Sequence, residues 1–142
     1  MSNSTPKSDY LLLFRGTNWD KGLSPQQLQK VIGEWYAWFE RLKQEGKCLG
    51  GHPLQNQGKV LSGPNGRHVA DGPFAESKEA IGGYFYLQVV DESEALEIAR
   101  QCPGLQYGAI VEMRPVAEMC SVRERALASA APSSKWPCSN PA

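Results

Sequence analysis

The chain has 142 residues, a length that suits one domain, and its 15 basic and 15 acidic side chains cancel. A neutral chain without a run of lysine and arginine has no field to gather polyanions, so we do not expect nucleic acid as a partner. The apolar stretches are too short to cross a bilayer and residues 2–8 are too polar for a signal-peptide core, so we expect a cytoplasmic protein without membrane contact.

The first part of the chain predicts a strand followed by an amphipathic helix. Residues 1–9 are polar and without periodicity, so we expect a disordered N-terminus. The apolar run Tyr10–Phe14 predicts a central strand that is covered on both faces. The segment Ser24–Gln27 has the N-cap serine, first-turn proline and third-position glutamine of a capping box, and Gly46 ends the helix. Its apolar positions recur every three or four residues and are expected to face a sheet: Leu28, Val31, Ile32, Trp35, Trp38, Phe39 and Leu42.

The middle of the chain predicts a second strand, a hairpin and a third strand. Residues Lys47–Leu54 contain two glycines that would tolerate a bulge, and Pro53 points to a sheet edge. Residues 59–61 and 67–70, on either side of an Asn-Gly turn, predict a small hairpin outside the main sheet. The aromatic and β-branched residues of Tyr84–Val90 predict the third core strand.

The last part of the chain predicts a second helix, a fourth strand and an extension. Asp91–Glu94 provides a cap and an acidic first turn, and Cys102–Gly104 stops the helix. Residues Tyr107–Arg114 predict the fourth strand, which completes a domain spanning residues 10–116. Within the extension, residues 117–142, we expect a short helix before residue 129 and then a mobile tail rich in Ala, Ser and Pro.

The cysteines do not form a pattern typical of metal binding. They stand at positions 48, 102, 120 and 138, without a Cys-x-x-Cys pair and without a histidine at ligand spacing. We therefore expect no metal site and no cofactor. Cys48 and Cys102 are expected to be buried free thiols.

The order of these elements predicts an α+β fold of the ferredoxin-like βαββαβ type with an inserted β-hairpin. Both helices should then cover one face of an antiparallel sheet and leave the other face open. Alternation places large side chains on that open face: Tyr84, Tyr86, Gln88, Glu112 and Arg114. Aromatic residues there favour contact with another chain over contact with water, so we expect a homodimer that pairs through its sheets.

A longer motif identifies a family. The run Asp71–Glu79, followed by Gly82–Tyr84 and later by Glu112–Pro115, resembles the signature of YCII-related proteins, in particular the branch named after its DGPF tetrapeptide. Ser77 stands where that branch usually has threonine. The resemblance extends from about Tyr10 to Val116, and it implies a dimeric α/β barrel made by two ferredoxin-like subunits.

The same resemblance implies less about chemistry. Some YCII-related proteins carry a histidine on the first helix and an aspartate elsewhere as an acid/base pair, but here Trp35 stands where that histidine would be. That pair therefore cannot be transferred to this chain. The resemblance also implies an association with extracytoplasmic-function sigma factors, and hence a sigma-factor-type protein partner.

Candidate site residues follow from side-chain chemistry. Histidine is the side chain that most naturally acts as an acid or base near neutral pH, so the candidate catalytic residues are His52, His68 and Asp71. The candidate ligand-binding residues are Arg15, Asp71, Glu76, Lys78, Tyr84, Tyr86, Glu112 and Arg114. Structural roles account for the same residues: Asp71–Phe74 has turn chemistry, and Glu112 with Arg114 suits an ion pair at a dimer interface.

Two hypotheses of function remain open, and the sequence does not decide whether the protein is an enzyme. In the first, the dimer has a polar cavity for a small molecule and is a cofactor-free acid/base enzyme of the lyase or isomerase type. In the second, it is a non-catalytic module that binds a ligand or a sigma-factor-type partner through Asp71–Glu79.

Overall fold

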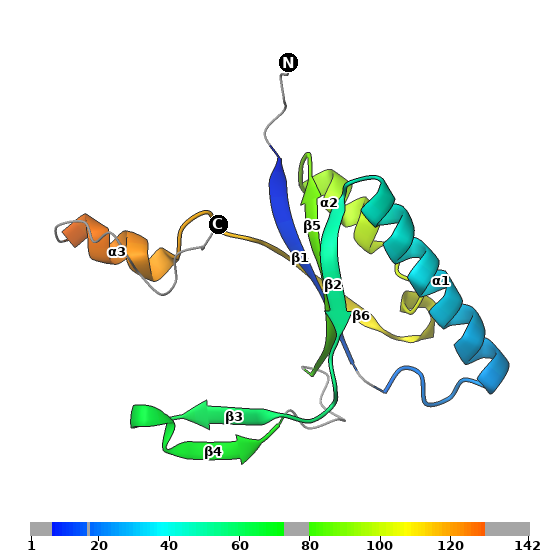
Figure 1. Ribbon diagram of the computed structural model, residues 1–142, viewed down its shortest axis with the longest axis horizontal. Helices are drawn as coiled ribbons and strands as arrows, with labels where there is room; N and C mark the ends of the chain where they lie inside the picture. Colours follow the sequence, from blue (N-terminus) through cyan, green and yellow to red (C-terminus); the bar gives the residue numbers. More distant parts are fainter. Residues whose placement is uncertain (1–6, 17, 73–79, 130–142) are drawn as a thin grey trace.

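The fold is a four-stranded antiparallel sheet with two helices on one side (Figure 1). We describe a computed structural model, in which residues 7–16, 18–72 and 80–129 are described. The strands are β1 (Ser8–Arg15), β2 (Cys48–Pro53), β3 (Lys59–Ser62), β4 (His68–Asp71), β5 (Ile81–Val89) and β6 (Ile110–Pro115). The helices are α1 (Pro25–Gln44), α2 (Glu92–Ala99) and α3 (Ser121–Ser129), with short 3-10 turns at Pro64–Gly66 and Leu105–Tyr107.

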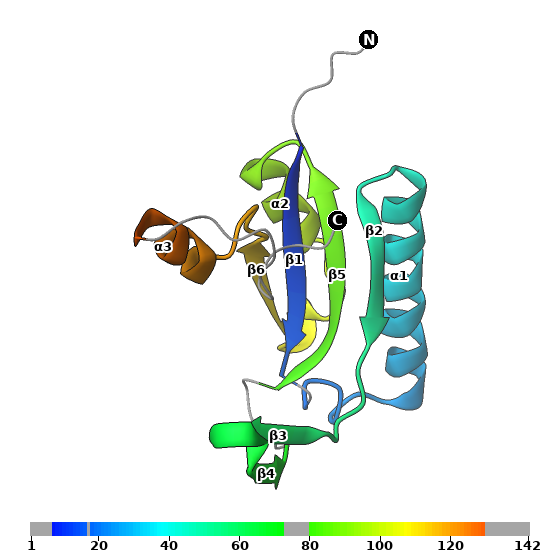
Figure 2. The ribbon, with the colours of Figure 1, turned by 60° about the vertical axis from the view of Figure 1, so that its left-hand side comes forward.

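The strand order of the main sheet is β2-β5-β1-β6, which is consistent with the ferredoxin-like fold. The expected α+β class and the central position of the first strand are confirmed, since β1 pairs with both β5 and β6. β2 lies at an edge of the sheet, and its register against β5 shifts between Cys48 and Gly50. Figure 2 shows α1 behind this edge, close to β2.

Three predicted strand starts were wrong by two or three residues, including that of β5, which begins at Ile81 and not at Tyr84. β1 begins at Ser8, inside the segment expected to be disordered, because Ser8 pairs with Val89 in the sheet. β6 begins at Ile110 and not at Tyr107, because Leu105–Tyr107 forms a 3-10 turn that ends at Gly108. Gly108 has a φ of 100°, a left-handed backbone conformation that favours glycine.

The start of α1 is fixed by the predicted capping box. The Ser24 side chain accepts a hydrogen bond from the backbone N–H of Gln27, and the Gln27 side chain accepts one from the backbone N–H of Ser24. Pro25 occupies the first turn, where a backbone N–H has no partner within the helix and its absence costs nothing. Gly46 follows the helix with a φ of 77°, as a helix stop requires.

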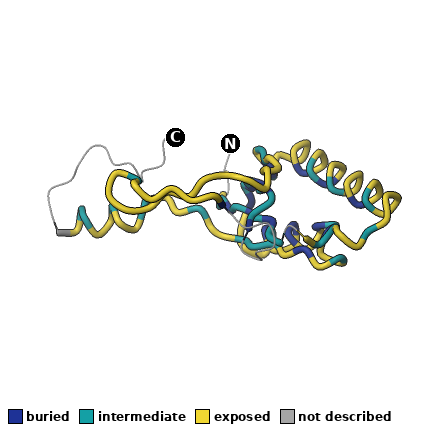
Figure 3. Tube along the Cα trace, turned by 90° about the horizontal axis from the view of Figure 1, so that it is seen from below, coloured by how far each residue is buried: buried dark blue, intermediate teal, exposed yellow. Residues whose placement is uncertain are grey.

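The core lies between the sheet and the two helices (Figure 3). Phe85, Leu87 and Val89 alternate into it from β5, and Leu12 is 0% exposed on the neighbouring strand. We expected both faces of β1 to be covered. Within one chain, only the face toward α1 and α2 is covered. Leu11 and Leu13 on the other face are only half-buried, so the sheet has an open face on the side away from α1 and α2.

The residues expected to form a hairpin form a separate two-stranded sheet. β3 and β4 pair in register from Lys59 with Asp71 to Ser62 with His68, and Asn65 in the turn has a φ of 58°. The hairpin stands away from the main sheet, as does α3 (Figures 1 and 2). Residues 1–6 of the expected disordered N-terminus and residues 130–142 of the expected tail lie outside the described residues.

α3 begins at Ser121, within the region expected to hold a short helix. α3 has 9 residues, which is too short to cross a bilayer. α1 has 20 residues but carries many charged side chains. Among the described residues, no helix is both long enough and apolar enough to span a membrane.

The predicted burial of two thiols is confirmed. Cys48 is 3% exposed and Cys102 is 4% exposed, and both are free cysteines. Burial disfavours the thiolate, so it raises the pKa of Cys48 and raises the pKa of Cys102 to about 11. At neutral pH both thiols are therefore protonated and behave as small apolar side chains.

Candidate functional site

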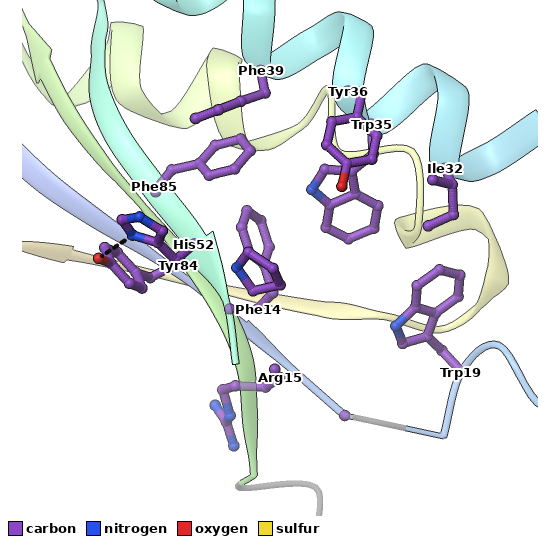
Figure 4. A pocket seen from close by; sticks show the side chains of 15 residues that line it. Phe14, Arg15, Trp19, Ile32, Trp35, Tyr36, Phe39, His52, Tyr84 and Phe85 are labelled. Carbon is purple, nitrogen blue, oxygen red and sulfur yellow. Dashed lines mark hydrogen bonds between the residues drawn. The ribbon is translucent and has the colours of Figure 1, made fainter. Parts of the chain in front are cut away.

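A cavity of about 250 Å³ opens between the middle of α1 and the ends of β2, β5 and β1 (Figure 4). Aromatic and aliphatic side chains form most of its wall, and glycines leave space in its floor. Its lining residues are Phe14, Arg15, Gly16, Trp19, Ile32, Trp35, Tyr36, Phe39, Gly51, His52, Pro53, Gly82, Gly83, Tyr84 and Phe85. We call this cavity the aromatic pocket.

The inner wall of the aromatic pocket is a connected set of rings. Phe14 meets Phe85 edge-on at 4.9 Å between centroids and Trp35 at 5.1 Å. Trp19, from the loop after β1, stacks on Trp35 at 5.7 Å with an interplanar angle of 22°. Such contacts hold Phe14, Trp35 and Phe85 in place from more than one side. A flat apolar molecule would therefore meet a preformed wall.

The floor of the pocket depends on close approach of two strands. A Cβ added to Gly51 would collide with the carbonyl oxygen of Tyr84 and would lie 2.7 Å from Phe85 Cδ1. A Cβ added to Gly83 would lie 3.1 Å from the carbonyl oxygen of His52. Glycine at these positions lets β2 pair closely with β5 and keeps this part of the pocket free of side chains.

A polar pair borders the pocket from the open face of the sheet. Nδ1 of His52 lies 2.9 Å from the hydroxyl oxygen of Tyr84, and the two residues are cross-strand neighbours on β2 and β5. Figure 4 shows both side chains on the other side of β2 from Phe14 and Trp35. His52 is exposed, and within the part of the chain that the structure describes it has no further hydrogen bond. Its Nε2 can therefore exchange a proton with a ligand or with water.

The open face carries further polar groups from the candidate list. Glu112 lies between two arginines, with Arg15 at 3.5 Å and Arg114 at 3.8 Å. The Tyr86 hydroxyl donates a hydrogen bond of 2.6 Å to Asp9. This bond requires the neutral phenol, so it raises the pKa of Tyr86 above its ordinary value. The structure thus places five candidates on one face with His52: Arg15, Tyr84, Tyr86, Glu112 and Arg114.

The other candidates lie elsewhere. His68 is exposed on β4 of the hairpin, and Asp71 at the base of the same strand forms an ion pair with Lys59. Strand alternation points His68 and Asp71 to opposite sides of the hairpin. Glu76 and Lys78 lie outside the described residues. The structure therefore separates His68 and Asp71 from His52.

Sequence reasoning missed most of the pocket wall. It assigned Ile32, Trp35 and Phe39 to the core stripe of α1, and it did not single out Trp19 or Tyr36. The available signal was the density of aromatic residues in residues 35–39, which exceeds what one narrow core stripe uses. Ile32 is 43% exposed and Tyr36 63% exposed, so these two side chains border the pocket without being buried.

The described residues contain no group of three or more His, Cys, Asp and Glu side chains placed to hold a metal ion. The polar side chains that line the pocket are His52, Tyr84, Tyr36 and Arg15.

Comparison with known proteins places the chain in a family. The model of the YCII-related domain matches residues 10–120. The chain belongs to the YCII-related family. A search of curated proteins finds no match to this YCII-related chain. Among solved structures it is similar to 5-chloro-2-hydroxyhydroquinone dehydrochlorinase from Burkholderia phenoliruptrix AC1100, in complex with 2,5-dihydroxybenzoquinone. The sequence identity is 18% over 73% of this chain and 90% of that chain, with a TM-score of 0.35.

Proposed function

We propose that this YCII-related chain binds a small aromatic molecule in the aromatic pocket and exchanges a proton with it through His52. The observation that carries the proposal is the pocket itself, in which stacked and edge-on rings form the wall and a histidine–tyrosine pair borders it from the other side of β2. Ligand sites typically combine an apolar concave surface with a few polar groups that set orientation. A volume of about 250 Å³ suits a molecule of one or two rings.

His52 and Tyr84 support the proton step. Their hydrogen bond holds the imidazole in one orientation and leaves Nε2 available to a ligand group that extends past the edge strand β2. Arg15 also lines the pocket and would attract a phenolate or carboxylate on the ligand. Its guanidinium forms an ion pair with Glu112, which weakens this attraction. A positioned histidine and a cation that holds the ligand are groups that a cofactor-free acid/base reaction of the lyase or isomerase type can use.

Replacing Trp35 by alanine should weaken binding of an aromatic ligand at least about tenfold, because it removes the ring on which Trp19 stacks. Calorimetric titration with phenol, benzoate and hydroxybenzoates measures this effect directly. Leu96→Ala is the matched control, since Leu96 is an exposed apolar residue of α2 away from the pocket. If no compound of the panel binds the wild-type chain at millimolar concentration, or if both variants bind as the wild type does, the proposal is wrong.

Replacing His52 by glutamine separates binding from chemistry. The dissociation constant of the ligand should stay within about threefold of the wild-type value. Turnover of a substrate from the same panel should fall by about 10²–10⁴, the usual contribution of a general acid or base. A His68→Gln variant is the control, because His68 lies on the hairpin. Equal turnover in the wild type and in His52→Gln would contradict proton transfer through His52 and leave the binding proposal standing.

We also propose that two copies pair through the open face of the main sheet to form a dimeric α/β barrel. Leu11 and Leu13 on this face lie between Tyr86 and Arg114 and between Tyr84 and Glu112, respectively. An apolar centre with polar groups around it is the usual composition of a protein interface. The DGPF branch and the sigma-factor-type partner remain proposals that depend on Asp71–Glu79, of which only Asp71 and Gly72 lie within the described residues.

A further inference from the structure

The hairpin of β3 and β4, residues 59–71, extends away from the body of the protein, and we call it the hairpin arm. Every residue of its two strands is exposed. In Figures 1 and 2 it lies below the main sheet and reaches past the open face, on the side away from α1 and α2. α3 also stands on this side of the sheet in Figure 1.

The hairpin arm exposes apolar side chains that a free surface does not need. Leu61 and Val69 are cross-strand partners, 61% and 59% exposed, and Val60 on the opposite side of the arm is 53% exposed. Strand alternation puts Leu61 and Val69 on the same face as the ion pair of Lys59 with Asp71. This face of the arm therefore carries an apolar pair, Leu61 with Val69, next to a charged pair, Lys59 with Asp71.

An isolated two-stranded hairpin is at best marginally stable in water, because it cannot bury an apolar face by itself. The register of the arm is nevertheless regular over four residue pairs, from Lys59 with Asp71 to Ser62 with His68. A surface that covers Leu61 and Val69 would supply the missing burial. Since the arm reaches past the open face, a molecule docked on that face is in position to cover Leu61 and Val69.

A hairpin arm that closes over the partner would enlarge the contact between two open faces. Four strands spaced by about 4.8 Å, each presenting about six residues at roughly 3.3 Å, give a footprint of about 400 Å² per copy. Stable specific interfaces bury roughly 1,200–2,000 Å² of accessible surface in total, so contact made by two arms, one from each copy, would add to a favourable quantity.

We propose that a second copy of this chain docks on the open face and that each copy's hairpin arm closes over the other copy, burying Leu61 and Val69. A two-fold axis makes the contact reciprocal, so one docking event covers both arms and both open faces. The inference rests on the proposed dimer and adds the arm as the element that stabilises it.

The test is sedimentation of the full chain over a dilution series, for the wild type and for the double variant Leu61→Asp, Val69→Asp. We expect a wild-type dimer, and a dissociation constant at least about tenfold higher for the double variant. Leu96→Asp is the control and should dissociate as the wild type does, since Leu96 is 40% exposed on α2, on the covered side of the sheet. A double variant with the wild-type dissociation constant overturns the role of the arm and leaves the dimer standing.

A second measurement does not depend on a substitution. Chains grown with light and heavy nitrogen are mixed, allowed to exchange subunits and treated with an amine cross-linker, and links from Lys59 are analysed by mass. Mixed-isotope links from Lys59 support the proposal, and links from Lys59 within one isotope class alone overturn it. A wild-type chain that is monomeric at micromolar concentration overturns both the dimer and the arm, whereas the pocket is judged separately by calorimetry.

Discussion

Replacing Phe85 by alanine should lower the free energy of unfolding by about 3–5 kcal/mol, the usual cost of deleting a buried phenylalanine ring. Phe85 is 6% exposed and is the residue at which core and pocket meet. Its ring centroid lies 4.9 Å from those of Phe14 and Trp38 and 4.8 Å from that of Phe39. Removing it would leave three rings without a common neighbour, and chemical denaturation followed by circular dichroism measures the loss.

Val90→Ala is the matched control for this substitution. Val90 directly follows β5 but is 49% exposed, so its truncation should cost less than about 1 kcal/mol. A Phe85→Ala variant as stable as Val90→Ala would show that the aromatic cluster does not support the core. Because Phe85 also lines the pocket, the same variant should bind aromatic ligands more weakly at temperatures at which it remains folded.

Alkaline pH should destabilise the protein through Cys102. Burial raises the pKa of this thiol in the folded state to about 11, above its ordinary value of 9.0. Between these two pKa values the folded state keeps the thiol proton that the unfolded state loses. The contribution of Cys102 to the free energy of unfolding is therefore fully present below pH 9 and is lost as the pH rises to 11. A shift of this size corresponds to about 2–3 kcal/mol, as an order of magnitude.

The experiment compares denaturation of the wild type and of Cys102→Ala at pH 7, 9, 10 and 11. Lys47, Cys48 and Tyr86 also have raised pKa values, so stability falls in both proteins and the contribution of Cys102 is the difference between their slopes. Cys120→Ala is the control, since Cys120 is only half-buried. Parallel pH profiles for the wild type and Cys102→Ala would contradict the prediction.

Local sequence signals predicted most of the fold because each of them acts over a few residues. The capping box at Ser24–Gln27, the helix stop at Gly46 and the Asn-Gly turn of the hairpin depend on backbone conformation and on hydrogen bonds within one turn. The starts of β1 and β6 were less predictable. Ser8 joins β1 through pairing with Val89, a residue far away in the sequence.

The candidate site was predictable only in part. Alternation along β5 and β6 correctly put Tyr84, Tyr86, Glu112 and Arg114 on one face, because the two-residue period of a strand is local. The partner of His52 was not predictable in this way. Its hydrogen bond to Tyr84 depends on the register of β2 against β5, which includes an irregularity between Cys48 and Gly50.

Local patterns in the chain are enough to predict the α+β class, the order of the elements and the two-sided pattern of the sheet. Which candidate residues meet depends on how distant segments pack. The tertiary structure joined His52 to Tyr84 at an aromatic pocket, and it placed His68 and Asp71 on a projecting arm. The physical reason is that a side chain's type and face follow from its neighbours in sequence, whereas a cavity forms where a helix and strand ends from distant parts of the chain converge.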